Sequence, residues 1–199
     1  MEVSHEFILS LEEKLQQALT PKRYLHTLGV AYLASSLAMC YGVNHRDALV
    51  AGLLHDCAKN IPEDELLEQC LDHNLDLSEY EKRIPGILHA PYGAYLAKEA
   101  YQITQEDILS AIRNHTLGRP NMSLLEQIVF LSDYLETERT QPTEPPLDVI
   151  RKVAFENLDD ATYLVCRNTL KYFEDTNIET DPMTEKTYQY YKEKSTTEF

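Results

Sequence analysis

Helix signals recur along the whole chain, and they limit its fold more than any other feature. Apolar residues return every three or four positions, and no stretch alternates between apolar and polar residues for long enough to predict a strand. Thr20 before Pro21 opens a helix that Gly42 closes after Tyr41, and Asn44 caps the next helix. We therefore expect an all-α protein built as a compact helical bundle.

Further helix boundaries follow from the same signals. The helix capped by Asn44 should run through HRDALVAGLLHDCAK, and Ile61-Pro62 should open another. Thr104 is expected to cap QEDILSAIRNH. Ser123 and Glu126 predict a capping box before the apolar run IVFL, where another helix begins.

The C-terminal part of the chain has a different pattern. Residues 136–146 contain three prolines and predict a loop. A long amphipathic helix should follow from about Leu147 to Asp175, with a polar tail around Thr184 to Lys194. We expect one domain over residues 1–199, with a core at about 20–140 and a long helix and C-terminal extension at 147–199.

Composition excludes several classes of partner. The 199 residues are enough for one hydrophobic core, and no apolar run reaches the roughly 20 residues of a membrane helix. A formal net charge of -15 disfavours nucleic acids and anionic membranes, because an acidic surface repels them. The four cysteines show no disulfide framework, which is typical of reduced thiols. These features predict a cytoplasmic protein without a targeting segment.

Histidines and aspartates interrupt apolar helix faces at several positions. His55 and Asp56 follow the small and apolar residues VAGLL, and Asp133 ends the run IVFLS. His26 lies on a helix face that continues with apolar residues. Burying imidazoles and carboxylates on such faces is costly unless a positive charge satisfies them, and a divalent metal would do so.

Each of these residues alone has a more ordinary explanation. A single histidine near an apolar stretch is usually a satisfied structural residue, and an aspartate that ends an apolar run is often a cap or an ion-pair partner. The ordered set favours chemistry instead. It comprises His26, His55 with Asp56, His89, His115 and Asp133.

The order H...HD...H...H...D resembles the HD superfamily of metal-dependent phosphohydrolases. Within it, the chain is similar to a bacterial branch, the YqeK family of symmetrical diadenosine-tetraphosphate hydrolases. The resemblance is carried by KRYLHTLGV, ALVAGLLHDCAKN, GILHAPYGAYLAKE and AIRNHTLGRPNMSLLEQIVFLSDYLETER, which cover most of residues 20 to 140. It implies an HD-domain helical bundle that hydrolyses diadenosine tetraphosphate, a small-molecule nucleotide, to two ADP.

The resemblance also implies a role for each matching residue. The metal ligands would be His26, His55, Asp56 and Asp133. The implied metal is iron, although mixed nitrogen and oxygen ligands also suit manganese or zinc. Such a metal would activate water and polarise a phosphoryl oxygen.

The resemblance implies that His89, His115 and Lys59 are catalytic residues. Protonated His89 or His115 would offset the negative charge of the phosphates. His89 and His115 resemble a histidine pair that carries a second metal in binuclear members of the superfamily, whereas in this branch they resemble phosphate-facing groups. Substrate contacts would come from Arg23, Asp56, Lys59, His89, His115, Thr116 and Arg139. The more ordinary explanation for Arg139 is a solvated loop arginine. Leu117 replaces a threonine of the branch, and the tail around Ile178 to Thr184 resembles a segment that closes over the nucleotide.

Two other functions stay open at this point. The same chemistry could act on a nucleoside monophosphate, a deoxynucleoside triphosphate or a cyclic nucleotide. A noncatalytic sensor could bind a nucleotide without turnover, although the presence of all four ligand positions disfavours it. The 13 tyrosines and the apolar stretches would also permit a homodimer.

Overall fold

The computed structural model describes residues 3–197, and within them it contains α-helices and one 3-10 helix but no strand. The prediction of an all-α fold is confirmed. Residues 1–2 and 198–199 of the predicted domain lie outside the described residues. The division into a core at 20–140 and an extension at 147–199 stays a prediction. No described helix combines the length and apolarity that crossing a membrane would require.

The helices follow one another along the chain, and the longest connection is the predicted loop between Leu135 and Leu147. In chain order they are α1 (His5–Ala18), α2 (Pro21–Cys40), α3 (His45–Leu54), α4 (Glu63–Asp72), α5 (Glu79–Arg83), the 3-10 helix η1 (Pro85–Ile87), α6 (His89–Glu99), α7 (Glu106–Asn114), α8 (Leu124–Leu135), α9 (Leu147–Glu156), α10 (Leu158–Thr176) and α11 (Pro182–Lys194).

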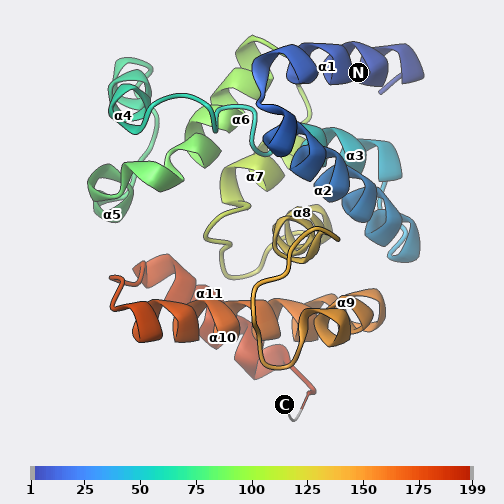
Figure 1. Ribbon diagram of the computed structural model, residues 1–199, viewed down its shortest axis with the longest axis vertical. Helices are drawn as coiled ribbons and strands as arrows, with labels where there is room; N and C mark the ends of the chain where they lie inside the picture. Colours follow the sequence, from blue (N-terminus) through green and yellow to red (C-terminus); the bar gives the residue numbers. More distant parts are fainter. Residues whose placement is uncertain (1–2, 198–199) are drawn as a thin grey trace.

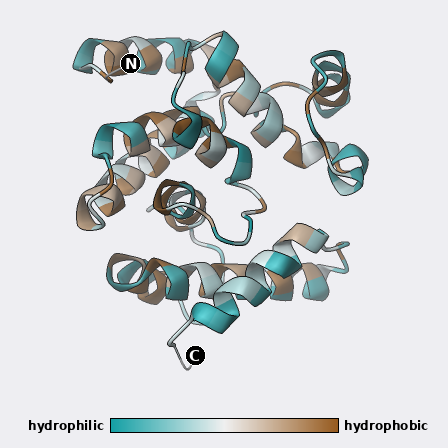
Figure 2. Cartoon of the chain, turned by 180° about the vertical axis from the view of Figure 1, so that it is seen from behind, coloured by the Kyte–Doolittle hydropathy of each residue, from teal (hydrophilic) through white to brown (hydrophobic). Residues whose placement is uncertain are grey.

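Helix α8 lies in the middle of the molecule. Helices α2, α7 and α10 all pack against it, and it separates the α1 to α3 group from the α9 to α11 group (Figure 1). Its residues are mostly apolar, as its brown colour shows in Figure 2. Helices α4 and α5 lie to one side, where a smaller apolar cluster forms under α4 and α6. The buried side chains of α8 therefore join the two halves of the bundle.

Close packing of α2 on α3 depends on a glycine. A Cβ atom at Gly52 would lie 2.6 Å from the Cα of Ala31, so only hydrogen at this position allows the two helices to approach so closely. The contact fixes the distance between the α2 residue His26 and the end of α3, where His55 lies.

Several predicted caps are confirmed. The Thr20 side chain accepts a hydrogen bond from the Arg23 amide, and Asn44 caps α3 in the same way through the amide of Arg46. Ser123 and Glu126 form the capping box at the start of α8. The prediction that Thr104 caps the helix over QEDILSAIRNH is wrong, because Gln105 occupies the N-cap position of α7.

The predicted helix over residues 45–59 is too long. Helix α3 ends at Leu54, and residues 55–60 form turns. His55 Nδ1 donates to the Gly52 carbonyl oxygen at 2.7 Å, so a side chain takes the acceptor that the amide of Asp56 would use in a continued helix. The chain leaves the helix at the residues that carry the functional groups.

The C-terminal predictions are corrected in two places. The long helix expected from Leu147 to Asp175 is interrupted at Asn157, whose backbone is extended and whose side chain caps α10. The polar tail expected around Thr184 to Lys194 belongs to helix α11, which packs along α10. Its Tyr191 side chain is fully buried and its hydroxyl oxygen accepts a hydrogen bond from the Met122 amide at 3.0 Å. This contact explains why a polar sequence forms a packed helix.

Candidate metal centre

Four histidines and two aspartates meet at one buried point of the bundle. They come from five helices or their ends: His26 from α2, His55 and Asp56 after α3, His89 from the start of α6, His115 after α7, and Asp133 from α8. The structure thus brings together all four predicted metal ligands and both additional histidines.

Asp56 lies between the four imidazoles and is 3% exposed. Its Oδ2 atom is 3.4 Å from His55 Nε2 and 3.8 Å from His26 Nε2. Its Oδ1 atom is 3.3 Å from His89 Nε2 and 3.8 Å from His115 Nε2. One carboxylate therefore faces two pairs of histidines, one pair on each oxygen.

The second carboxylate, that of Asp133, closes the same group. Its Oδ1 atom is 3.0 Å from His26 Nε2 and 3.9 Å from His55 Nε2. Three overlapping sets have their ligand atoms within 4.8 Å of one another: His26, His55 and Asp56; His55, His115 and Asp133; and Asp56, His89 and His115. The first two sets contain every predicted ligand, and the third offers a second position.

The chemistry of these atoms fits a divalent metal. The Nε2 atoms of His26, His55 and His115 are buried and have no hydrogen-bond partner among the described residues. Buried polar atoms normally make hydrogen bonds, so three nitrogens that face two carboxylates without making one are typical of ligands for a cation. Neutral imidazole and carboxylate groups are the donors such a cation needs.

Backbone carbonyls orient three of the four imidazoles. The Nδ1 atoms of His55, His89 and His115 each lie 2.7 to 2.9 Å from the carbonyl oxygen three residues earlier. His55 and His115 directly follow helices, where the last carbonyls lack helical partners. His89 follows the short η1 helix. Each ring consequently directs Nε2 toward the centre.

The pKa values reflect burial and mutual charge. Burial alone would raise the pKa of Asp56 and Asp133, but neighbouring imidazoles hold both pKa values well below the usual range. Burial, with His115 and Lys59 nearby, lowers the pKa of His89 to about 3. Burial, with His55 nearby, lowers the pKa of His115 to about 4. These low pKa values favour neutral rings, so the structure gives no support for a protonated His89 or His115, and their role in offsetting phosphate charge stays a prediction.

Three predicted substrate-binding cations border the centre. Arg23 Nη1 lies 2.6 Å from Asp56 Oδ2, and Arg139 Nη2 lies 2.8 Å from Asp133 Oδ1. Lys59 Nζ lies 3.1 Å from His89 Nδ1. Arg23 and Arg139 both line an open cavity of about 580 Å³ beside His26. Arg139 is thus paired with a candidate ligand and differs from a freely solvated loop arginine.

Thr116 and Glu136 complete the comparison with the sequence. Thr116 directly follows His115 and is half-buried, and its contact with a substrate stays a prediction.

Glu136 was not among the predicted site residues, although it lies in ETER and only three residues after Asp133. It is 2% exposed, and its Oε1 atom is 3.2 Å from His26 Nδ1. Its place in a proline-rich loop gave no signal of burial, which depends on α2.

A helical bundle that gathers four imidazoles and two carboxylates at one buried point defines a protein built around a metal centre. The sequence model of the HD domain family matches residues 23–138, and the chain belongs to this family. The predicted resemblance to the HD superfamily is confirmed.

Relatives of known name cover most of the chain. "Bis(5'-nucleosyl)-tetraphosphatase, symmetrical" of Bacillus subtilis is 36% identical over 185 residues, which cover 88% of this chain and 92% of the relative. The protein of the same name from Halalkalibacterium halodurans is 40% identical over 172 residues, which cover 85% of this chain and 89% of the relative. A crystal structure described as a predicted HD superfamily hydrolase involved in NAD metabolism, from Clostridium acetobutylicum, has a TM-score of 0.89 at 36% identity. That comparison covers 97% of this chain and 99% of the other.

Proposed function

We propose that this chain hydrolyses diadenosine tetraphosphate symmetrically, to two molecules of ADP. The observation that carries the proposal is the convergence of four imidazoles on Asp56, with Asp133 beside them. Relatives at 36% and 40% identity carry the name symmetrical bis(5'-nucleosyl)-tetraphosphatase, which supports this substrate over other nucleotides.

The proposed metal ligands are His26, His55, Asp56 and Asp133. When bound, a divalent metal would polarise a phosphoryl oxygen and activate water. We propose iron, with manganese and zinc as the alternatives that the same donor set allows. We propose the third set of ligand atoms, from Asp56, His89 and His115, as a position for a second metal.

Phosphate charge would be offset by the cations at the edge of the centre. Arg23, Lys59 and Arg139 all lie against acidic or imidazole groups of the centre, and both arginines are partly exposed toward the neighbouring cavity. Their positive charge would stabilise a polyphosphate and its leaving group. His89 and His115 stay neutral because their pKa values are low, and a neutral imidazole is suited to bind a metal.

Product analysis tests this function directly. Purified, iron-loaded protein incubated with diadenosine tetraphosphate should release ADP alone. A nucleoside monophosphate, a deoxynucleoside triphosphate and a cyclic nucleotide, supplied at the same concentration, should be turned over more slowly. Release of ATP with AMP, or faster turnover of one of the three other nucleotides, would contradict the proposal. Binding without any turnover would favour the noncatalytic sensor.

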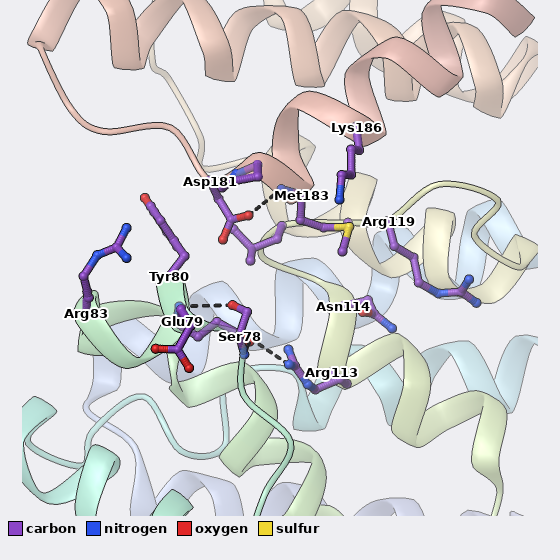
Figure 3. Close-up of a pocket in the computed structure, with 14 residues that line it drawn as sticks. Ser78, Glu79, Tyr80, Arg83, Arg113, Asn114, Arg119, Asp181, Met183 and Lys186 are labelled. Atoms are coloured by element: carbon purple, nitrogen blue, oxygen red, sulfur yellow. Dashed lines mark hydrogen bonds and ion pairs between the residues drawn. The ribbon is translucent and has the colours of Figure 1, made fainter.

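A second cavity is the proposed site for a nucleoside end of the substrate. It measures about 380 Å³ and is enclosed by α5, the end of α7 and the start of α11 (Figure 3). Leu117 and Met183 supply apolar surface, and Asp181 contributes a buried Oδ2 atom without a hydrogen-bond partner in the structure. An apolar wall with an unpaired acceptor suits a base and its sugar hydroxyls.

The segment before α11 is held against α5 beside this cavity. The Tyr80 hydroxyl donates to the Glu179 carbonyl oxygen at 2.7 Å, and Arg83 Nη2 lies 2.7 Å from the Glu179 carboxylate. The contact supports the expectation that residues 178–184 close over the nucleotide. Asp181 and Met183 are the members of this segment that we propose as its contacts.

Replacing Met183 by alanine should raise the KM for diadenosine tetraphosphate by about tenfold, because apolar surface in the proposed pocket is lost. The metal content and kcat should stay unchanged, since the metal centre is built from other helices. Leu71→Ala is a matched control, because Leu71 is an exposed apolar residue of α4 that does not line the cavity. An unchanged KM for Met183→Ala would place the nucleoside elsewhere.

Location and assembly stay proposals. The acidic charge of -15 supports a small nucleotide as the partner and disfavours nucleic acids and anionic membranes. A cytoplasmic location agrees with the four cysteines, which are all free in the structure. A homodimer agrees with exposed apolar side chains such as Leu25, Tyr32 and Met39 of α2.

A further inference from the structure

We propose that Glu136 is a positioning residue for the metal centre, and that it fixes His26 in the tautomer whose Nε2 atom is free to bind metal. The inference rests on the metal centre of the proposed function but does not depend on which nucleotide is the substrate. It concerns the one histidine of the centre that the backbone does not orient.

His26 differs from the other three histidines in its place on the helix. His55, His89 and His115 pair Nδ1 with a backbone carbonyl at the edge of a helix. His26 lies inside α2, where the carbonyl oxygens are engaged by the helix itself. Its Nδ1 atom therefore needs a partner from another part of the chain.

Glu136 supplies this partner from the end of α8. Its Oε1 atom lies 3.2 Å from His26 Nδ1, and its Oε2 atom accepts the amide of Glu138 at 2.8 Å. An ionised carboxylate can only accept, so it favours the proton on Nδ1 and leaves the Nε2 lone pair available. That Nε2 atom is buried and lies 3.0 Å from Asp133 Oδ1.

The surrounding structure holds the Glu136 carboxylate in place. A Cβ atom at Gly29 would lie 2.9 Å from Glu136 Oε2, so the glycine of α2 provides the space for this buried side chain. The Glu136 backbone carbonyl accepts hydrogen bonds from Arg151 Nη2 at 2.9 Å and from the Arg139 amide at 3.0 Å. Because both the backbone and the carboxylate of Glu136 are held by these contacts, its side chain can set the orientation of the His26 ring.

The charge of Glu136 gives His26 a different role from the other histidines. Three imidazoles donate to neutral carbonyl groups, whereas His26 donates to a carboxylate. A carboxylate partner raises the basicity of a ligating imidazole as well as orienting it. We therefore expect His26 to contribute more to metal affinity than a carbonyl-bound histidine in its place would.

Two variants separate these effects. Glu136→Ala should weaken metal binding by about 10- to 100-fold, the usual loss for such a partner of a ligating histidine. The metal affinity of Glu136→Gln should lie between that of Glu136→Ala and that of the wild type. The amide oxygen of glutamine can still accept a hydrogen bond from Nδ1, but it carries no charge. Glu174→Gln, at an exposed position of α10, is the matched control for the charge change and should bind metal as the wild type does.

The measurements do not need a substrate. Metal affinity is measured by competition with a chelator for iron and for manganese. The state of His26 is read from nitrogen-15 NMR of the imidazole in zinc-loaded protein, because the Asp133 carboxylate, 3.0 Å from Nε2, competes for the proton when no metal is bound. The signal is assigned from a His26→Gln variant. Wild type should show the proton on Nδ1 and a metal-bound Nε2, and Glu136→Ala should lose part of the metal-bound Nε2 signal. Glu136→Gln covers the case in which the alanine variant does not fold.

The proposal is overturned if Glu136→Ala keeps the wild-type metal affinity or the wild-type His26 signal, or, where only Glu136→Gln folds, if that variant keeps the wild-type metal affinity. It is supported by a loss of affinity that is larger in Glu136→Ala than in Glu136→Gln, together with loss of the metal-bound His26 signal in Glu136→Ala. Absence of turnover of diadenosine tetraphosphate by the wild type would contradict the proposed function alone and leave this inference standing.

Discussion

Replacement of Asp56 by asparagine should remove the metal and the hydrolytic activity together. Asparagine keeps the volume of the side chain but not its negative charge, which faces four imidazoles and the guanidinium of Arg23. Turnover should fall by at least about 10²- to 10³-fold, the loss typical of removing one charge-stabilising group from an active site. Metal content by elemental analysis and ADP release are the two measurements.

Asp64→Asn is the matched control for Asp56→Asn. Asp64 is an exposed residue of α4, so its substitution changes the net charge equally and should leave metal content and turnover unchanged. A circular dichroism spectrum establishes whether Asp56→Asn remains helical. If a folded Asp56→Asn variant retains both metal and turnover, Asp56 does not belong to the metal centre.

The second large effect is expected at Gly52. Alanine there would place its Cβ atom 2.6 Å from the Cα of Ala31, so α2 and α3 must separate. We expect the free energy of unfolding to fall by about 3 kcal/mol, at the upper end for overpacking. The Tm should then fall by roughly 6 to 12 °C in a protein of this size. Thermal unfolding followed by circular dichroism gives both values.

Gly42→Ala provides the comparison for Gly52→Ala. Gly42 has a φ of 69°, and no atom lies within 4 Å of a Cβ atom built there. Only backbone strain opposes that substitution, at about 1 to 2 kcal/mol, so its effect should be smaller. A Gly52→Ala variant that loses no more stability than Gly42→Ala would show that the close contact with Ala31 does not make Gly52 necessary.

Local signals made much of the fold predictable. Caps such as Thr20, Asn44 and Ser123 act within a few residues, so the sequence alone identifies them. The end of α3 depends instead on the His55 side chain, which competes for a backbone carbonyl. Helix α11 depends on the burial of Tyr191 against a distant loop. Such contacts between distant residues leave no local pattern.

The centre was predictable for a related reason. Histidines and aspartates on apolar faces are costly to bury, so their presence predicts a shared partner, and the structure brings all six together. Glu136 gave no such signal, because its loop is polar and proline-rich. The low pKa values of His89 and His115 were also missed, since they depend on how deeply the fold buries both rings.

The ligands at the centre and one wall of the smaller cavity come from different parts of the chain. Residues 26 to 133 supply the imidazoles and carboxylates, whereas residues 181 to 186 of α11 and its cap form one wall of the cavity. Under the proposed function, mutations in the last quarter of the gene can change which base is preferred without disturbing the reactive groups. A change of base preference among descendants of this chain can therefore arise at these residues of α11 while the metal centre stays the same.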